Sequence, residues 1–125
     1  MILVDSCGWL EYFSGSALAS TYYQYLKRPK EIITPTIVLY EIYKKIKKDF
    51  GEEDALLAAS QTGETIIVPL TESIALTAAD YSLELKIPMA DAIVYATAAA
   101  KKAKIVTSDA HFKHLENVVF IDKKS

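Results

Sequence analysis

The sequence has little cysteine, little glycine and no long apolar run. Its one cysteine, Cys7, excludes an internal disulfide framework and a cysteine-based zinc site, and so few thiols fit a reducing compartment. The four glycines are far apart, so the chain has no phosphate-binding loop and no dinucleotide fingerprint. No apolar run approaches the ~20 residues that span a bilayer, and Asp5 interrupts any signal-peptide apolar region. We therefore expect a cytoplasmic protein that binds no membrane.

The composition is that of one folded domain. The chain has 125 residues, of which 51% are hydrophobic and 24% are charged, which excludes a disordered chain. This length suits one hydrophobic core, so we expect a single domain over residues 1–125. A formal net charge of -2 disfavours binding of nucleic acid through a strongly basic overall surface.

Short β-branched runs alternate with helical periodicity along the chain. The pattern predicts strands at residues 1–4, 31–35, 65–68, 104–107 and 118–121. It predicts helices over about 6–14, 18–28, 36–50, 52–61, 72–85 and 92–103, with Ser6, Thr36, Thr71 and Asp91 at their starts. The helix at 92–103 is rich in alanine and apolar nearly all round, so we expect it to be buried. Such alternation is typical of an α/β fold, a three-layer α/β/α sandwich around a five-stranded parallel sheet.

Four carboxylates occupy positions that differ from those of the other acids. Asp5 ends the first predicted strand, and Asp109 follows the fourth. Asp91 begins the buried alanine-rich helix, and Glu41 lies within an otherwise apolar helical stretch. In open α/β sheets the functional crevice lies outside the carboxyl ends of the strands. The pattern therefore predicts that all four side chains approach that edge of the sheet.

Four converging carboxylates repel one another unless a cation neutralises them. Oxygen ligands select hard divalent ions, so the set predicts a Mg²⁺ or Mn²⁺ site. Such a site activates water and stabilises charge that develops on phosphoryl oxygens, which indicates phosphodiester hydrolysis.

Simpler explanations exist for each acid taken alone. Asp5, Asp91 and Asp109 each stand where a helix N-cap is expected, and a cap is as good an interpretation as a metal ligand. Glu41 lies mid-helix and is no cap, but tyrosine hydroxyls, Lys44 or Lys45 provide alternative partners. A receiver-like phosphoacceptor domain also has an aspartate at a strand end, although it would explain neither Glu41 nor Asp91.

Four short segments together resemble the PIN-domain ribonucleases, and within them the VapC-type toxins of toxin–antitoxin pairs. The segments are Leu3-Val4-Asp5-Ser6 with Trp9, Thr34-Pro35-Thr36 leading to Glu41, Ile87-Pro88-Met89-Ala90-Asp91-Ala92-Ile93 running into Ala96-Thr97-Ala98, and Val106-Thr107-Ser108-Asp109 with Phe112. Each segment is a weak match, but their order and spacing span nearly the whole chain.

The resemblance implies a function. Asp5, Glu41, Asp91 and Asp109 would be catalytic residues that bind Mg²⁺ or Mn²⁺ for endoribonuclease cleavage of an RNA substrate. Ser6 and Thr107 match hydroxyl positions that would orient ligands or water. The family also implies a homodimer and a cognate antitoxin protein that inhibits the toxin. Without the four candidate ligands, 12 acids stand against 14 basic residues, so the acidic charge does not argue against RNA.

One position departs from the resemblance. Many relatives have a further acid two residues after the last aspartate, where this chain has His111. The metal would then be bound less strongly at this corner, or His111 would contact substrate. With His114 it forms His-x-x-His, but a zinc site needs further ligands, so a surface or packing role is the simpler interpretation. The departure supports an alternative function, a weak or inactive PIN-like module that binds RNA or protein.

Lysines and tyrosines allow two interpretations each. Lys44, Lys45, Lys47 and Lys48 either complement a helix C-terminus or form a track for the phosphate backbone. The tyrosines of the early helices belong to the core or to a dimer and antitoxin surface, or one or two of them stack on bases.

Overall fold

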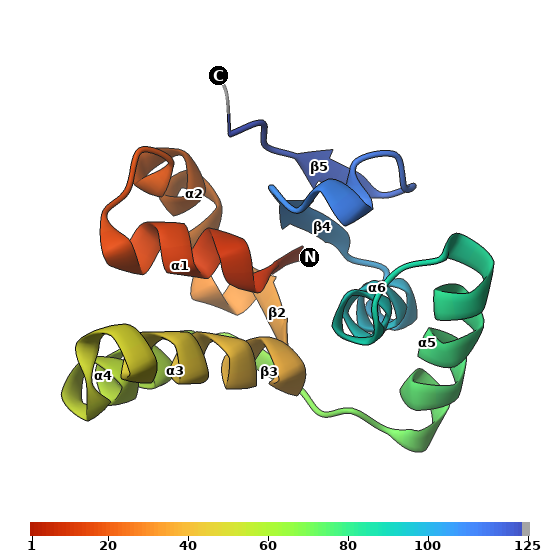
Figure 1. The fold of residues 1–125 in the computed structure, drawn as a ribbon, viewed down its shortest axis with the longest axis horizontal. Coiled ribbons are helices and arrows are strands. Elements are labelled where there is room, and N and C mark those ends of the chain that lie inside the picture. The colour runs from red at the N-terminus through yellow and green to blue at the C-terminus, as the bar shows by residue number, and fades with distance from the viewer. Residues whose placement is uncertain (124–125) are drawn as a thin grey trace.

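The computed structural model describes residues 1–123, so the last two residues of the predicted domain lie outside the described part (Figure 1). Its strands are β1 (Ile2–Val4), β2 (Ile32–Pro35), β3 (Ile66–Val68), β4 (Lys104–Thr107) and β5 (Val118–Phe120). Its α-helices are α1 (Ser6–Ser14), α2 (Ala19–Leu26), α3 (Thr36–Phe50), α4 (Glu52–Thr62), α5 (Glu72–Leu85) and α6 (Met89–Lys101). A 3₁₀ turn, η1 (Pro29–Glu31), precedes β2, and a second, η2 (Ala110–Phe112), follows β4. Each of the predicted strands and helices is present, with ends that shift by a few residues.

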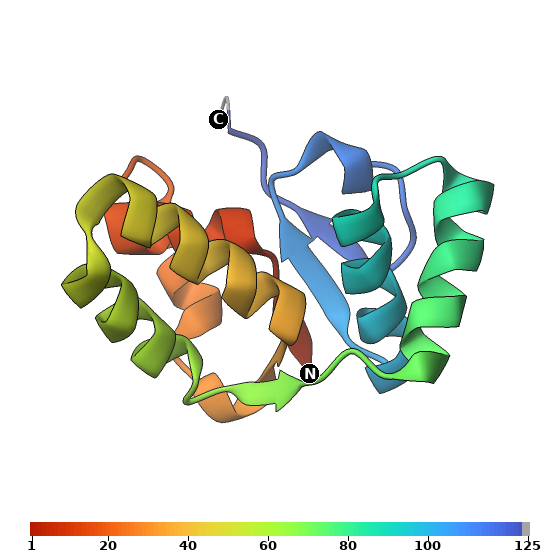
Figure 2. The ribbon, with the colours of Figure 1, turned by 60° about the horizontal axis from the view of Figure 1, so that its bottom comes forward.

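The five strands form one parallel sheet in the order β3-β2-β1-β4-β5, which confirms the predicted sheet. The chain builds outward from β1 to β3 and then returns across the sheet to β4. Parallel crossovers are right-handed, so connections that run in opposite directions place their helices on opposite faces. Figures 1 and 2 show α5 and α6 on one side of the strands and α1 to α4 on the other. The three-layer α/β/α architecture is therefore confirmed.

The core fills both interfaces between helices and sheet. Leu3 and Ile105 of neighbouring strands are fully buried, as is Ile42 of α3. Six consecutive or near-consecutive residues of α6 are buried, namely Ala92, Ile93, Val94, Ala96, Thr97 and Ala98. Small side chains let this helix lie close to the sheet, as the sequence predicts.

Three helix starts differ from the sequence prediction. The N-cap of α1 is Asp5 rather than Ser6, and the N-caps of α3 and α6 are prolines, Pro35 and Pro88. Proline has a fixed φ and no N–H to satisfy, so it suits the entry to a helix. Consequently α6 begins at Met89, and Asp91 lies inside its first turn instead of opening it. Within residues 1–123, no helix has the length and apolar character that a membrane span requires.

Candidate active site

The carboxyl ends of β1 and β4 lie side by side at the point where the chain reverses its direction across the sheet. Val4 pairs with Val106, and the Asp5 N–H continues the ladder by donating to the Val106 carbonyl at 3.1 Å. Open α/β sheets place their ligand-binding crevice at this type of switch. Asp5 follows β1 directly, and Asp109 lies two residues beyond β4.

Asp5 combines a structural and an electrostatic role. Its Oδ1 accepts the Ser6 N–H at 2.8 Å, so the capping interpretation of this residue is correct. Its Oδ2 accepts the Thr107 hydroxyl at 3.1 Å, and the side chain is only 4% exposed. A cap needs only one oxygen, so the second oxygen is held by a neutral partner, the Thr107 hydroxyl.

The Thr107 hydroxyl connects both strand-end aspartates. It donates to Asp5 and accepts the Asp109 N–H at 3.0 Å. The Cys7 thiol lies 3.4 Å from the same hydroxyl and accepts the Ser108 N–H at 3.4 Å. Burial and the Asp5 carboxylate raise the pKa of this thiol. Cys7 therefore belongs to the hydrogen-bond network that holds the loop after β4.

Asp91 and Asp109 meet at the imidazole of His111. The His111 Nδ1 lies 2.8 Å from Asp91 Oδ2 and 3.1 Å from Asp109 Oδ1. One ligand atom from each of the three residues lies within 4.8 Å of the other two. Asp109 also caps η2, because its Oδ1 accepts the His111 N–H at 2.9 Å. That short turn directs residue 111 back toward the carboxylates.

Glu41 approaches the same site from α3. Burial and the negative charges of Asp5 and Asp109 raise the pKa of Glu41, whereas a side-chain hydrogen bond with Ser6 opposes the rise. The alternative partners proposed for Glu41 have other contacts: Lys44 donates to the Tyr40 hydroxyl, and Lys45 pairs with Asp49 at 3.0 Å. Glu41 therefore faces the carboxylate site.

Burial and mutual repulsion act on these carboxylates together. Burial, followed by the charges of Asp109 and Asp5, raises the pKa of Asp91 to about 6. Burial is also the largest cause of the raised pKa of Asp5, and Asp109 adds to it. In the described part of the chain, no lysine or arginine forms an ion pair with any of the four acids.

The structure brings Asp91 and Asp109 together with His111, and within residues 1–123 this close ligand group includes neither Asp5 nor Glu41. Asp5 and Glu41 lie near enough for their charges to act on the other acids, with Thr107 bonded to Asp5 and Ser6 to Glu41. The site has several carboxylate oxygens, a net negative charge and one imidazole beside it. This set of donors fits a divalent cation. A buried carboxylate without a cationic partner is costly, and a bound cation removes that cost.

The contact of His111 with the acids was not anticipated from the sequence. A surface or packing role was the simpler interpretation of His111, whereas its imidazole contacts two of the acids. His114 is exposed and belongs to no group of potential metal ligands within residues 1–123. The spacing Asp109-x-His111, with aspartate as the cap of a short turn, is the sequence feature that would have indicated the contact with Asp109.

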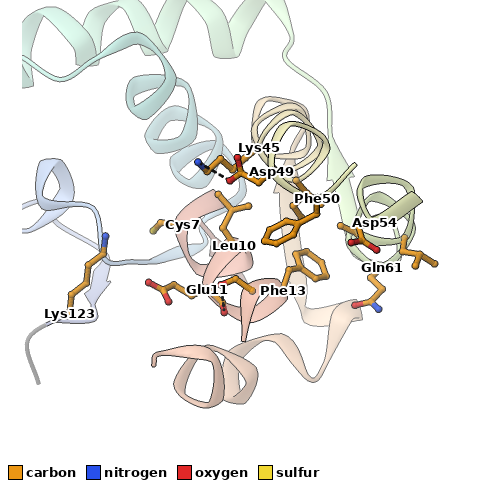
Figure 3. A pocket seen from close by; sticks show the side chains of 14 residues that line it. Cys7, Leu10, Glu11, Phe13, Lys45, Asp49, Phe50, Asp54, Gln61 and Lys123 are labelled. Atoms are coloured by element: carbon orange, nitrogen blue, oxygen red, sulfur yellow. Dashed lines mark hydrogen bonds and ion pairs between the residues drawn. The ribbon is translucent and has the colours of Figure 1, made fainter. Parts of the chain in front are cut away.

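A groove of about 680 Å³ begins beside the site and runs between α1, α3 and α4 (Figure 3). Leu10, Phe13 and Phe50 project into its middle. Its remaining lining residues include Cys7 at one end and Leu57, Ala58 and Gln61 of α4 at the other. The Lys45–Asp49 ion pair lies on its rim, so the groove has an apolar floor and a charged edge.

The basic cluster on α3 is exposed and mostly paired locally. Lys45 pairs with Asp49, and Lys47 lies 3.6 Å from Glu52 and over the ring of Tyr43. These contacts agree with the interpretation of the cluster as a solvated helix end.

The chain matches a known protein family. The model of the family described as "PIN domain" matches residues 2–118. No curated protein matches the sequence.

Several solved structures share the fold at low sequence identity. A toxin–antitoxin complex from Klebsiella pneumoniae superposes with a TM-score of 0.81 at 23% identity, over 95% of this chain and 96% of that chain. VapC20 of Mycobacterium tuberculosis, described as a sarcin-ricin loop cleaving toxin, has a TM-score of 0.77 at 20% identity, over 94% and 97%. VapBC2 from Rickettsia felis, bound to a DNA fragment from its promoter, has a TM-score of 0.74 at 18% identity, over 97% and 98%.

Proposed function

The chain belongs to the PIN domain family, and on that basis we propose that it is a metal-dependent endoribonuclease that hydrolyses RNA phosphodiester bonds. The observation that carries the proposal is the cluster of Asp91, Asp109 and His111 beside the carboxyl end of β1, where Asp5 lies and where Glu41 experiences the charges of Asp5 and Asp109. Burial and mutual repulsion raise the pKa of three of these side chains, and no lysine or arginine among residues 1–123 pairs with any of the four.

In this proposal the four carboxylates hold Mg²⁺ or Mn²⁺. The ion supplies Lewis-acid chemistry, because it lowers the pKa of water and stabilises charge that develops on phosphoryl oxygens. Thr107 fixes Asp5 and the backbone of Asp109 relative to each other, and Ser6 holds Glu41. These two hydroxyls are therefore positioning groups, which keep the ligand oxygens in place between turnovers.

Cleavage of RNA by the purified protein tests the proposal. We expect cleavage with Mg²⁺ or Mn²⁺, its loss in EDTA, and its loss in Asp5→Asn and Asp91→Asn. Asp80→Asn is the matched control, because Asp80 is an exposed acid of α5 that belongs to no group of potential metal ligands within residues 1–123. Full metal-dependent activity in either site variant would show that these residues are not the catalytic ligands.

We further propose that the protein is the toxin of a toxin–antitoxin pair in the cytoplasm. The similar structures from K. pneumoniae and R. felis are complexes of this type. The apolar groove supports a protein partner, since Phe50 and Leu57 line it and are 61% and 59% exposed. Its end at Cys7, next to Asp5, would let a bound antitoxin segment block the site.

Co-expression with any small protein encoded in a neighbouring reading frame tests the toxin role. We expect that protein to relieve growth arrest, and Leu57→Glu to weaken the complex while RNA cleavage persists. Leu56→Glu is the control, because Leu56 is the neighbouring residue of α4, is 55% exposed and lies outside the groove. If no neighbouring protein binds, the toxin role is wrong and the nuclease proposal still stands.

We also propose a homodimer. Leu76 and Leu83 are seven residues apart on one face of α5 and are 64% and 82% exposed, which supports a protein contact there. Sedimentation of the wild-type protein tests this proposal, and we expect the mass of a dimer. A monomer at micromolar concentration would contradict it.

A second function has one observation in its favour. The His111 imidazole already contacts Asp91 and Asp109, as a cation would, and this supports a weak or inactive module that binds RNA or protein. Titration with Mn²⁺ separates the two functions, because a ligand that binds the native state raises stability. RNA binding without a thermal shift or cleavage would favour the binding module.

A further inference from the structure

We infer that His111 is a metal ligand through its Nδ1 nitrogen, and that this nitrogen makes the site select Mn²⁺ over Mg²⁺. The inference rests on the metal site of the proposed function and concerns the identity of the ion. It starts from the two short contacts of Nδ1, at 2.8 Å from Asp91 Oδ2 and 3.1 Å from Asp109 Oδ1.

The position of the imidazole is imposed by the backbone around it. Asp109 caps η2 and accepts the His111 N–H at 2.9 Å, so the turn that carries His111 is tied to a candidate ligand. Phe112, the next residue, is fully buried and anchors the turn in the core. The His111 side chain itself is 55% exposed, so it has room for the small adjustment that ligation requires.

Geometry at Nδ1 fits a shared cation. Oxygens of Asp91 and Asp109 and a nitrogen of His111 all lie within 4.8 Å of one another, which is the spacing of atoms around one ion. Without metal, Nδ1 donates its N–H to these carboxylates; when a cation binds, that proton leaves Nδ1, and the neutral imidazole presents the Nδ1 lone pair to the ion. The second nitrogen is left for solvent or substrate.

A nitrogen ligand changes which ion the site prefers. Mg²⁺ favours oxygen ligands in near-ideal octahedral geometry, whereas imidazole suits transition metals. Affinities of a mixed nitrogen and oxygen site rise along the transition series that starts at Mn²⁺. The other candidate histidine does not contribute, because His114 is exposed and outside the ligand group within residues 1–123.

Metal binding by the purified protein and three variants tests the inference. Dissociation constants for Mn²⁺ and Mg²⁺ are measured by calorimetry for wild type, His111→Asp, His111→Ala and His114→Asp. We expect His111→Asp to lower the preference for Mn²⁺ over Mg²⁺ by about tenfold or more, the scale at which partners of metal sites alter affinity. His114→Asp adds the same carboxylate one turn away and should leave the preference unchanged.

Electron spin resonance of bound Mn²⁺ gives a readout that does not depend on activity. We expect a nitrogen coupling in wild type and in His114→Asp, and its absence in His111→Asp and His111→Ala. The inference would be overturned if wild type binds Mn²⁺ without nitrogen coupling, or if His111→Asp leaves the preference for Mn²⁺ over Mg²⁺ unchanged. Either result would leave the proposed nuclease function standing. Tighter binding of both ions to His111→Ala would also overturn it, because the imidazole would then compete with the metal. No metal binding by wild type would remove the proposed function itself.

Discussion

Thr107 and Asp5, 102 positions apart in the sequence, are joined by a hydrogen bond of 3.1 Å between two buried side chains. The same hydroxyl accepts the Asp109 N–H at 3.0 Å, so one side chain sets the distance between two strand ends. Asp5 Oδ1 is already used by the cap of α1. The orientation of its second oxygen therefore depends on Thr107.

Replacing Thr107 with valine should reduce RNA cleavage strongly while the protein remains folded. The change removes a donor to Asp5 and an acceptor for the Asp109 N–H, which costs about 1–3 kcal/mol of unfolding free energy. Loss of a partner that orients a ligand typically reduces activity by about 10–100-fold. Chemical denaturation and RNA cleavage at saturating Mn²⁺ measure the two effects.

Thr97→Val is the matched control for that variant. Thr97 is also buried, but its hydroxyl donates only to the Ile93 carbonyl at 2.7 Å, within its own helix. We expect a stability change of similar or smaller size and unchanged cleavage. Equal losses of activity in Thr97→Val and Thr107→Val would show that the loss reflects general destabilisation of the fold.

Asp91→Asn should stabilise the metal-free protein while it abolishes cleavage. The amide retains an oxygen that accepts from His111, and it removes a charge that Asp109 and Asp5 repel. Loss of one electrostatic stabiliser of a transition state costs about 10²–10³-fold in rate. Thermal unfolding in EDTA should show a higher midpoint than wild type, and the exposed-site control Asp80→Asn should show no change. A lower midpoint would mean that Asp91 is a net stabilising residue without metal.

The same repulsion predicts how stability depends on pH. The pKa of Asp91 is about 6 in the folded protein against an ordinary aspartate value of 3.8, so the folded state binds more protons between these values. Stability of the metal-free protein therefore falls as pH rises through this window, and Asp5 and Glu41 shift in the same direction. Metal binding needs ionised carboxylates, so stabilisation by Mn²⁺ should grow over the same range. Unfolding midpoints with EDTA and with Mn²⁺, at about pH 5 and about pH 7.5, check both trends.

The sequence predicted the strand-end acids because their positions follow from chain direction alone. Asp5 follows β1 directly and Asp109 lies two residues beyond β4, and parallel strands bring their carboxyl ends to one edge. Asp91 was predicted for a related reason, since a loop returning to that edge precedes its helix. Local periodicity and turn residues were enough for these placements.

Contacts between side chains could not be predicted in the same way. The contact of His111 with Asp91 depends on a 3₁₀ turn of three residues, which is too short to leave a periodic pattern. The link from Cys7 to Ser108 joins residues 101 positions apart, and no local pattern encodes it. The capping prediction for Ser6 missed by one residue because the strand-end Asp5 is itself a good cap.

Gly8 is required by the packing of Tyr22 against the site, and this predicts a large effect from a small change. A Cβ at Gly8 would contact Tyr22 Cε1, and would lie 2.6 Å from Tyr22 Cδ1 and 2.8 Å from Val4 Cγ1. The ring cannot move aside, because Tyr22 is fully buried and its hydroxyl is 2.6 Å from Ser108 Oγ, in the loop that carries Asp109.

Gly8→Ala should therefore destabilise the protein by about 1–3 kcal/mol, the usual cost of overpacking a core, and should also reduce cleavage. Gly15→Ala is the control: Gly15 has a φ of 66° and open space around it, so it carries backbone strain of about 1–2 kcal/mol without a clash. Adding Tyr22→Leu to Gly8→Ala should recover part of the stability, because two residues in contact are energetically coupled. It should not recover cleavage, since the hydroxyl that holds Ser108 is gone. Purely additive losses in the double variant would show that Gly8 and Tyr22 are not coupled.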